Sequence, residues 1–165
     1  MITFRKVKEN DLEIVRDIAF KTWPSTYNDI VGEDQVAYML EKMYNKGALL
    51  DQLENGCVFL IAEREQHEVG FTAFDNIDPE NGVYKLHKLY LLPEEHGTGI
   101  GKIMMNEVYN QVRRAGGSCL QLNVNKKNKA LQFYERMGFK IKKAVTIDIG
   151  NGFVMDDYIM ELPLK

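Results

Sequence analysis

Three alternating glycines follow an apolar stretch and precede an amphipathic one, and this run constrains the fold more than any other feature. Gly97, Gly99 and Gly101 stand just before a segment whose apolar residues have helical spacing. Glycines leave the backbone N–H groups accessible at a helix N-terminus, where the positive end of the helix dipole favours an anion. The sequence therefore predicts a strand, a phosphate-binding loop and a helix in succession.

The spacing of these glycines disfavours two common nucleotide-binding loops. A dinucleotide fingerprint needs G-x-G-x-x-G, whereas the run here is G-x-G-x-G. A P-loop needs a glycine five residues before its Gly-Lys pair, followed by Ser or Thr. His96 and Ile103 occupy those positions. An unrelated nucleotide-binding domain is therefore the weaker interpretation.

A second segment, residues 125–139, adds a further pattern: Asn128, Ala130, the pair Phe133-Tyr134 and the pair Gly138-Phe139. Together the two segments resemble the GNAT superfamily of acyl-CoA-dependent N-acetyltransferases. In that family the loop reads Gln/Arg-x-x-Gly-x-Gly/Ala, and the later segment reads Asn, Ala, Phe-Tyr and Gly-Phe in this order. His96 departs from the usual Gln or Arg but can still donate a hydrogen bond to phosphate.

Two shorter stretches narrow the resemblance to the PaiA-type polyamine acetyltransferases of bacteria. The first is the Trp-x-x-Thr-Tyr stretch that begins at Trp23, and the second is the Met-Asp-Asp-Tyr-Ile-Met stretch near the end of the chain. The resemblance to the superfamily covers nearly the whole chain.

Apolar periodicity predicts the secondary structure. Strands are expected at 2–7, 58–63, 69–76, 83–92, 119–124, 139–149 and 153–162. Helices are expected from Asn10 to Trp23-Pro24, at 33–44, 48–54 and 127–137, and from residue 100 to Gly116-Gly117. We expect one α/β domain over residues 1–165, with a mixed, mostly antiparallel sheet of about seven strands and helices on both faces, as in the GNAT family. Strand 119–124 follows a helix and should lie parallel to strand 83–92.

Charge and residue content argue against several classes of partner and binding site. The formal net charge of −3 argues against nucleic acid as the main partner, and no apolar run is long enough to span a membrane. Cys57 and Cys119 are far apart, which favours buried reduced thiols and a cytoplasmic location. The three histidines lack metal-ligand spacing, so we expect no metal.

The resemblance implies acetyl-CoA as cosubstrate. Its pyrophosphate would meet the loop, its pantetheine arm would pair with the preceding strand, and the Leu91 N–H would polarise the thioester carbonyl. The cofactor-binding residues implied are Leu89, Tyr90, Leu91, His96, Gly97, Thr98, Gly99, Ile100, Gly101, Lys102 and Asn128.

Two side chains are candidates for acid–base catalysis. Tyr134 would protonate the leaving thiolate, although its spacing equally fits a core aromatic. His87 would accept the proton of the amine, although it equally fits a half-exposed strand residue between two lysines. Strand alternation puts His87 on the same side as Leu89 and Leu91 unless a bulge intervenes.

The acceptor is expected to be a small cationic amine such as a polyamine. The resemblance places Trp23, Tyr27 and Tyr38 on the acceptor side. Asp156 interrupts an apolar strand pattern beside Asp157, so a buried or cleft-facing carboxylate could attract a cation. A protein N-terminal or lysine acetyltransferase, and a non-catalytic acyl-CoA-binding regulatory module, remain alternatives. A homodimer also remains open.

Overall fold

The computed structural model describes residues 1–164, and within them the chain forms one seven-stranded mixed sheet with the order β1-β2-β3-β4-β5-β7-β6. The strands are β1 Ile2–Lys6, β2 Val58–Arg64, β3 His67–Asp78, β4 Val83–Leu91, β5 Cys119–Asn125, β6 Lys140–Gly150 and β7 Phe153–Pro163. The helices are α1 Leu12–Val31, α2 Glu33–Tyr44, α3 Lys46–Glu54, α4 Ile100–Arg114 and α5 Ala130–Arg136, with short 3-10 turns at Glu9–Asp11 and Pro93–Glu95. The predicted α/β sheet is confirmed.

The strand directions follow from the connections. Strand pairs β1–β2, β2–β3, β5–β7 and β6–β7 are antiparallel, whereas β4 and β5, which α4 connects, are parallel as predicted. The described ladder between β4 and β5 joins Val83–Leu86 to Cys119–Leu122, and β4 continues beyond it to Leu91.

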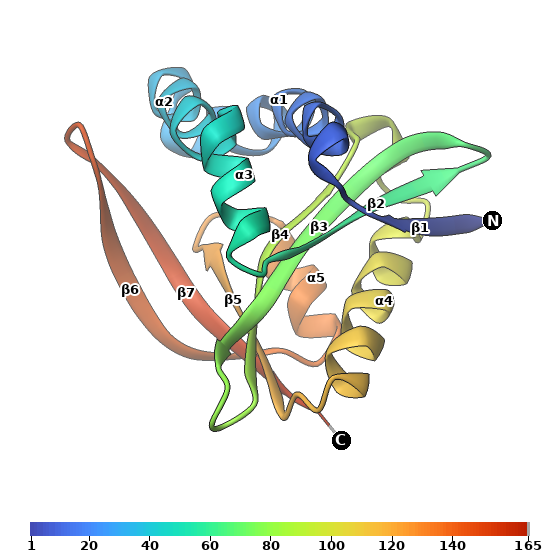
Figure 1. The fold of residues 1–165 in the computed structure, drawn as a ribbon. Helices are drawn as coiled ribbons and strands as arrows, with labels where there is room; N and C mark the ends of the chain where they lie inside the picture. Colours follow the sequence, from blue (N-terminus) through green and yellow to red (C-terminus); the bar gives the residue numbers. More distant parts are fainter. Residues whose placement is uncertain (165) are drawn as a thin grey trace. The chain divides into compact units, whose positions relative to one another are not determined.

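Internal contacts divide the chain into two compact units. Unit 1 comprises Met1–Asp75 and His87–Val108. In it, α1, α2 and α3 lie together on one side of the strands, and the first part of α4 lies on the other (Figure 1). Unit 2 comprises Asn76–Leu86 and Tyr109–Lys165 and contains the long β6–β7 hairpin.

Alternation along the strands gives unit 1 two apolar layers. On the α4 side a cluster of Ala62, Val69, Ile100 and Met104 is buried, and Ile2, Phe4, Leu89 and Leu91 pack against it. On the other side the Phe71 ring lies 6.1 Å from the Tyr44 ring of α2 and 5.7 Å from the Tyr90 ring of β4. Strand β4 therefore presents leucines to one layer and Tyr90 to the other.

The first helix was predicted wrongly at both ends. Asn10 lies in a 3-10 turn, and α1 begins at Leu12 and continues to Val31 with Pro24 inside it. Proline removes one hydrogen bond, yet the apolar face continues past it, because the Trp23 and Tyr27 rings lie 4.6 Å apart in the buried layer. Tertiary packing outweighs the local helix-ending signal here.

The last helix is shorter than predicted, beginning at Ala130 instead of residue 127. Two asparagine side chains account for the difference. Asn125 accepts from the Lys127 N–H at 2.9 Å, and Asn128 accepts from the Ala130 N–H at 2.9 Å. These local bonds turn the backbone before the helix can begin.

Candidate active site

The glycine loop has the shape that the sequence predicted. Gly97 and Gly99 have φ values of +80° and +83°, and α4 begins directly afterwards at Ile100. A Cβ atom built on either glycine would meet nothing within 4 Å, so this side of the loop is open. The Ile103 N–H donates to the Gly99 carbonyl at 3.3 Å, and the N–H groups before it lie at the free end of the helix. This is a suitable site for an anion.

Contacts that sequence reasoning missed hold the loop in place. Glu95 is buried and accepts a hydrogen bond from Arg64, while the Thr98 hydroxyl donates to the Glu95 carbonyl at 2.5 Å. The Leu92 N–H donates to the Val69 carbonyl at 2.8 Å, and Ile100 is buried in the apolar cluster. The Arg64–Glu95 pair joins residues 31 positions apart, which no local pattern indicates.

His96 contacts the end of β4. Its Nε2 lies 3.0 Å from the carbonyl oxygen of Leu91. A carbonyl oxygen only accepts, so Nε2 is the donor in this bond. His96 therefore connects the loop to the residue whose N–H is expected to polarise the thioester. Lys102 is exposed in the first turn of α4.

Tyr90 connects β4 to the first helix. Its hydroxyl lies 3.0 Å from the Tyr27 hydroxyl, and its ring lies 5.7 Å from the Trp23 ring. Among the described residues, the Trp23 Nε1 and the Tyr44 hydroxyl are buried without a hydrogen-bond partner. Two of the three aromatics expected on the acceptor side, Trp23 and Tyr27, thus pack beside the thioester strand.

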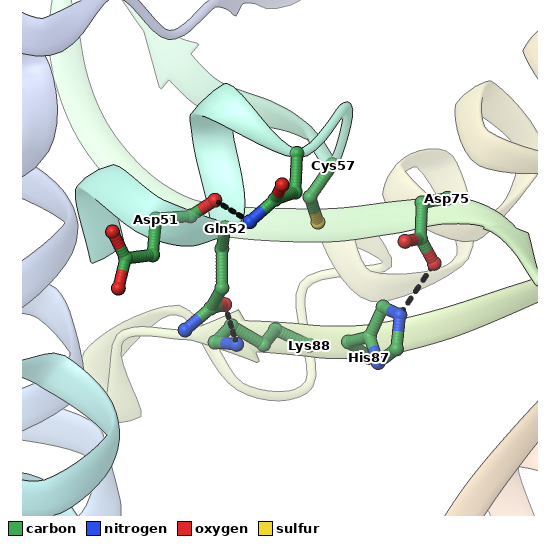
Figure 2. Close-up of a pocket in the computed structure, with 7 residues that line it drawn as sticks. Asp51, Gln52, Cys57, Asp75, His87 and Lys88 are labelled. Atoms are coloured by element: carbon green, nitrogen blue, oxygen red, sulfur yellow. Dashed lines mark hydrogen bonds and ion pairs between the residues drawn. The ribbon is translucent and has the colours of Figure 1, made fainter. Parts of the chain in front are cut away.

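His87 lies in a cavity of about 340 Å³ within unit 1 (Figure 2). Its Nε2 lies 2.6 Å from Oδ1 of Asp75 on β3, and the two side chains are 31% and 30% exposed. The cavity is lined by Asp51, Gln52, Asn55, Cys57, Asp75, His87 and Lys88.

The expected side for His87 is corrected. His87 and its neighbour Lys88 both line the cavity, whereas Leu89 and Leu91 pack on the α4 side. Asp75 of β3 contacts the imidazole ring at the cavity (Figure 2). Strict alternation would not have placed the two successive residues together.

Lys88 is a buried cation that sequence reasoning did not single out. It is 5% exposed, its Nζ lies 2.6 Å from Oε1 of Gln52, and it stands over the Tyr44 and Phe59 rings at 5.5 and 5.6 Å. Nearby, burial raises the pKa of the Cys57 thiol to about 11, so Cys57 stays protonated at neutral pH. Cys57 is buried, as expected, and Cys119 is partly buried.

Tyr134 and Asn128 belong to unit 2. Tyr134 is 9% exposed, and its ring lies 5.4 Å from Phe133 and 5.8 Å from Phe139. Asn128 accepts from the Ala130 N–H just before α5. Both residues therefore have the structural role that the sequence allowed, and their catalytic or binding role remains a prediction.

The two aspartates of β7 differ in burial. Asp157 is 4% exposed, and its Oδ1 has no hydrogen-bond partner among the described residues. Burial raises the pKa of Asp157, and a hydrogen bond from Asn123 opposes this shift. Asp156, for which the sequence predicted a buried or cleft-facing carboxylate, is not buried: its side chain is 56% exposed and pairs with Lys126 at 2.9 Å. Successive side chains of a strand point to opposite faces of the sheet, so Asp156 and Asp157 have different surroundings.

Within residues 1–164, no group of three or more His, Cys, Asp or Glu side chains is arranged to hold a metal ion. No helix in that range is both long and apolar enough to cross a membrane.

Residues 55–141, more than half of the chain, match the acetyltransferase (GNAT) domain family. The chain belongs to this family. The predicted class, an acyl-CoA-dependent N-acetyltransferase, is confirmed with it.

The similarity to N-acetyltransferases extends beyond residues 55–141. A spermidine N(1)-acetyltransferase of Thermoplasma acidophilum is 27% identical over 161 residues, covering 94% of this chain and 96% of the relative. An uncharacterised N-acetyltransferase of Methanocaldococcus jannaschii is 30% identical over 152 residues, and that alignment covers 87% of this chain and 62% of the relative.

Solved structures agree on the fold. The PaiA N-acetyltransferase of Thermoplasma acidophilum, in complex with coenzyme A, has a TM-score of 0.82 and 28% identity, with 99% of each chain covered. A GCN5-related N-acetyltransferase of Rhodopseudomonas palustris has a TM-score of 0.84 at 19% identity and supports the fold alone. The GNAT candidate residues of this chain fall into two groups, the loop with His87 in unit 1 and Asn128, Tyr134 and Asp157 in unit 2.

Proposed function

We propose that this GNAT enzyme transfers the acetyl group of acetyl-CoA to a primary amine of a small cationic substrate such as a polyamine. One observation carries the substrate class: the spermidine N(1)-acetyltransferase of Thermoplasma acidophilum matches 94% of this chain. The buried carboxylate of Asp157 supports it, because its Oδ1 has no protein donor among the described residues and an ammonium group could supply one.

Acetyl-CoA fits the loop as this structure has it. The open side of Gly97 and Gly99 allows a pyrophosphate to approach the backbone N–H groups at the start of α4. Gly101 lies in the first turn of α4, and we expect a larger side chain there to crowd the phosphate. The PaiA relative binds coenzyme A.

The proposed chemistry breaks one carbon–sulfur bond and forms one carbon–nitrogen bond. The amine nitrogen attacks the thioester carbonyl, which the Leu91 N–H polarises, and the thiolate leaves. Tyr134 gives its hydroxyl proton to that thiolate, and His87 takes a proton from the amine. The products are the acetamide and the free thiol of coenzyme A.

The test is an acetyl-transfer screen that measures thiol release with a colorimetric reagent. Spermidine and spermine are compared with a neutral-bodied monoamine and with peptides that offer an α-amine or a lysine. We expect kcat/KM to be highest for the polyamines and to fall with added salt, because screening weakens the attraction of a cation to an acidic site.

Two results would contradict this proposal. Preferred acetylation of the peptides would identify a protein acetyltransferase. Tight binding of acetyl-CoA without thiol release for any amine would identify a non-catalytic acyl-CoA-binding module. The Asp157→Asn variant adds a second test, since we expect its KM to rise for polyamines and to change little for the monoamine.

A further inference from the structure

The side chains of Asp75 on β3 and His87 on β4 are hydrogen-bonded to each other, and both line the 340 Å³ cavity. We infer that Asp75 is a positioning residue, which fixes the orientation and tautomer of the His87 imidazole so that its Nδ1 receives the proton of the acceptor amine. This inference deepens the proposed function and rests on it, because it takes His87 as the base of the same reaction.

The tautomer follows from the contact. Oδ1 of Asp75 lies 2.6 Å from Nε2 of His87, and an ionised carboxylate can only accept a hydrogen bond. Nε2 therefore carries the hydrogen, and the neutral ring has its lone pair on Nδ1. A base that is held in one tautomer and one orientation loses less entropy on reaching the transition state.

The burial of the pair suits proton transfer. Both side chains are about one-third exposed, at 31% and 30%, so the pair is neither isolated from substrate nor freely rotating in solvent. When Nδ1 takes the amine proton, the ring becomes an imidazolium and Asp75 remains ionised beside it. The proton then passes to solvent from the exposed ring, which restores the neutral imidazole.

The other ionisable groups of the cavity do not replace either partner. The Lys88 Nζ is hydrogen-bonded to Gln52 and lies over two aromatic rings, and these contacts restrain the position of its charge. Cys57 is a protonated thiol at neutral pH, and Asp51 lines the cavity from α3. Asp51 thus offers a matched control: a carboxylate of the same cavity on a different element.

The kinetic test compares Asp75→Asn, Asp75→Glu and Asp51→Asn with the wild-type enzyme. We expect Asp75→Asn to lower kcat by roughly 10²–10⁴-fold with KM for acetyl-CoA unchanged. Its acidic limb in the kcat profile should move to lower pH, because the ring loses a neighbouring negative charge. Asp75→Glu should restore part of kcat, and Asp51→Asn should keep both kcat and the profile. An Asp75→Asn enzyme with wild-type kcat and profile would overturn the inference.

A second measurement needs no turnover. Nitrogen-15 NMR of histidine-labelled protein reports the tautomer of each ring, and the chain has three histidines. We expect His87 to be the Nε2–H tautomer in the wild type and to lose that preference in Asp75→Asn, while His96 keeps its own. An Nδ1–H ring at His87 in the wild type would refute the inference. Failure of the proposed function would look different, as a wild-type enzyme that releases no thiol with any amine.

Discussion

The predicted role of Tyr134 as an acid can be tested by removing its hydroxyl group alone. Tyr134→Phe keeps the ring that packs against Phe133 and Phe139 and removes only the hydroxyl donor. We expect kcat to fall roughly 10²–10⁴-fold while the affinity for acetyl-CoA and the melting temperature stay close to wild type. Steady-state kinetics and calorimetry measure these quantities. Tyr109→Phe on α4 is the matched control and should change neither kcat nor the melting temperature. Unchanged turnover in Tyr134→Phe would mean that Tyr134 only packs against its neighbours.

Asp157, the carboxylate that we propose attracts the acceptor amine, is also expected to affect stability. Because burial raises its pKa, the folded state binds this proton more tightly than the unfolded state does. The free energy of unfolding therefore falls as the pH rises from about 4, the ordinary carboxyl value, through the raised pKa of the folded state. At neutral pH the buried carboxylate destabilises the fold.

Asp157→Asn should therefore stabilise the protein at pH 7 by about 1 kcal/mol, the scale of one desolvated polar group, and the gain should disappear below pH 4. Urea unfolding at a series of pH values measures this. Asp156→Asn is the control. That exposed residue pairs with Lys126, and its loss should change the free energy of unfolding little, because solvent screens an exposed ion pair. A wild type more stable than Asp157→Asn at pH 7 would contradict this account of Asp157.

Among the elements, the β4 backbone lies close to Gly70 of β3. A Cβ atom there would lie 2.5 Å from the Tyr90 carbonyl oxygen and 3.3 Å from the Leu91 Cα. Gly70→Ala should push β4 outward at the thioester strand, destabilise the fold by about 1–3 kcal/mol and lower kcat. Gly47→Ala, whose Cβ would meet only the Asn45 side chain at 3.4 Å, should leave activity unchanged. Equal behaviour of the two variants in unfolding and kinetics would contradict the role given to Gly70.

The loop and α4 act together as the proposed anion site. Gly101→Val places a branched side chain in the first helical turn without a helix-propensity penalty relative to glycine. We expect a large loss of acetyl-CoA affinity by calorimetry with the fold intact. Gly99→Ala should instead destabilise the protein, because its φ of +83° disfavours a side chain. Unchanged affinity in a folded Gly101→Val protein would move the phosphate site elsewhere.

For the whole molecule, binding of a ligand should increase the free energy of unfolding. A ligand at about 100 times its Kd stabilises the folded state by about 2.7 kcal/mol. For a chain of this length that raises Tm by about 5–10 °C. Differential scanning calorimetry with coenzyme A measures the shift, and Gly101→Val should abolish it. A wild-type Tm that does not respond to coenzyme A would argue against the loop as its site.

The linear pattern of residues predicted the elements and the class of fold, and the family resemblance that it carries implied acetyl-CoA as cosubstrate. Periodicity located every strand to within two residues, and the glycine spacing distinguished this loop from two other phosphate loops. These features are local, because alternation, turn residues and loop glycines act over a few positions. The same locality explains two errors, the proline inside α1 and the start of α5, where packing and asparagine hydrogen bonds competed with propensity.

Only the tertiary structure decided which polar side chains share a site or lie buried. Asp75 and His87 are 12 residues apart and Arg64 and Glu95 are 31 apart. Neighbouring strands bring the first pair together, and the 3-10 turn after β4 brings Glu95 to the end of β2. Asp157, not Asp156, is the buried carboxylate, and the two successive side chains point to opposite faces of β7. Burial and partner depend on contacts between distant segments, and a linear pattern of apolar and polar residues does not encode them.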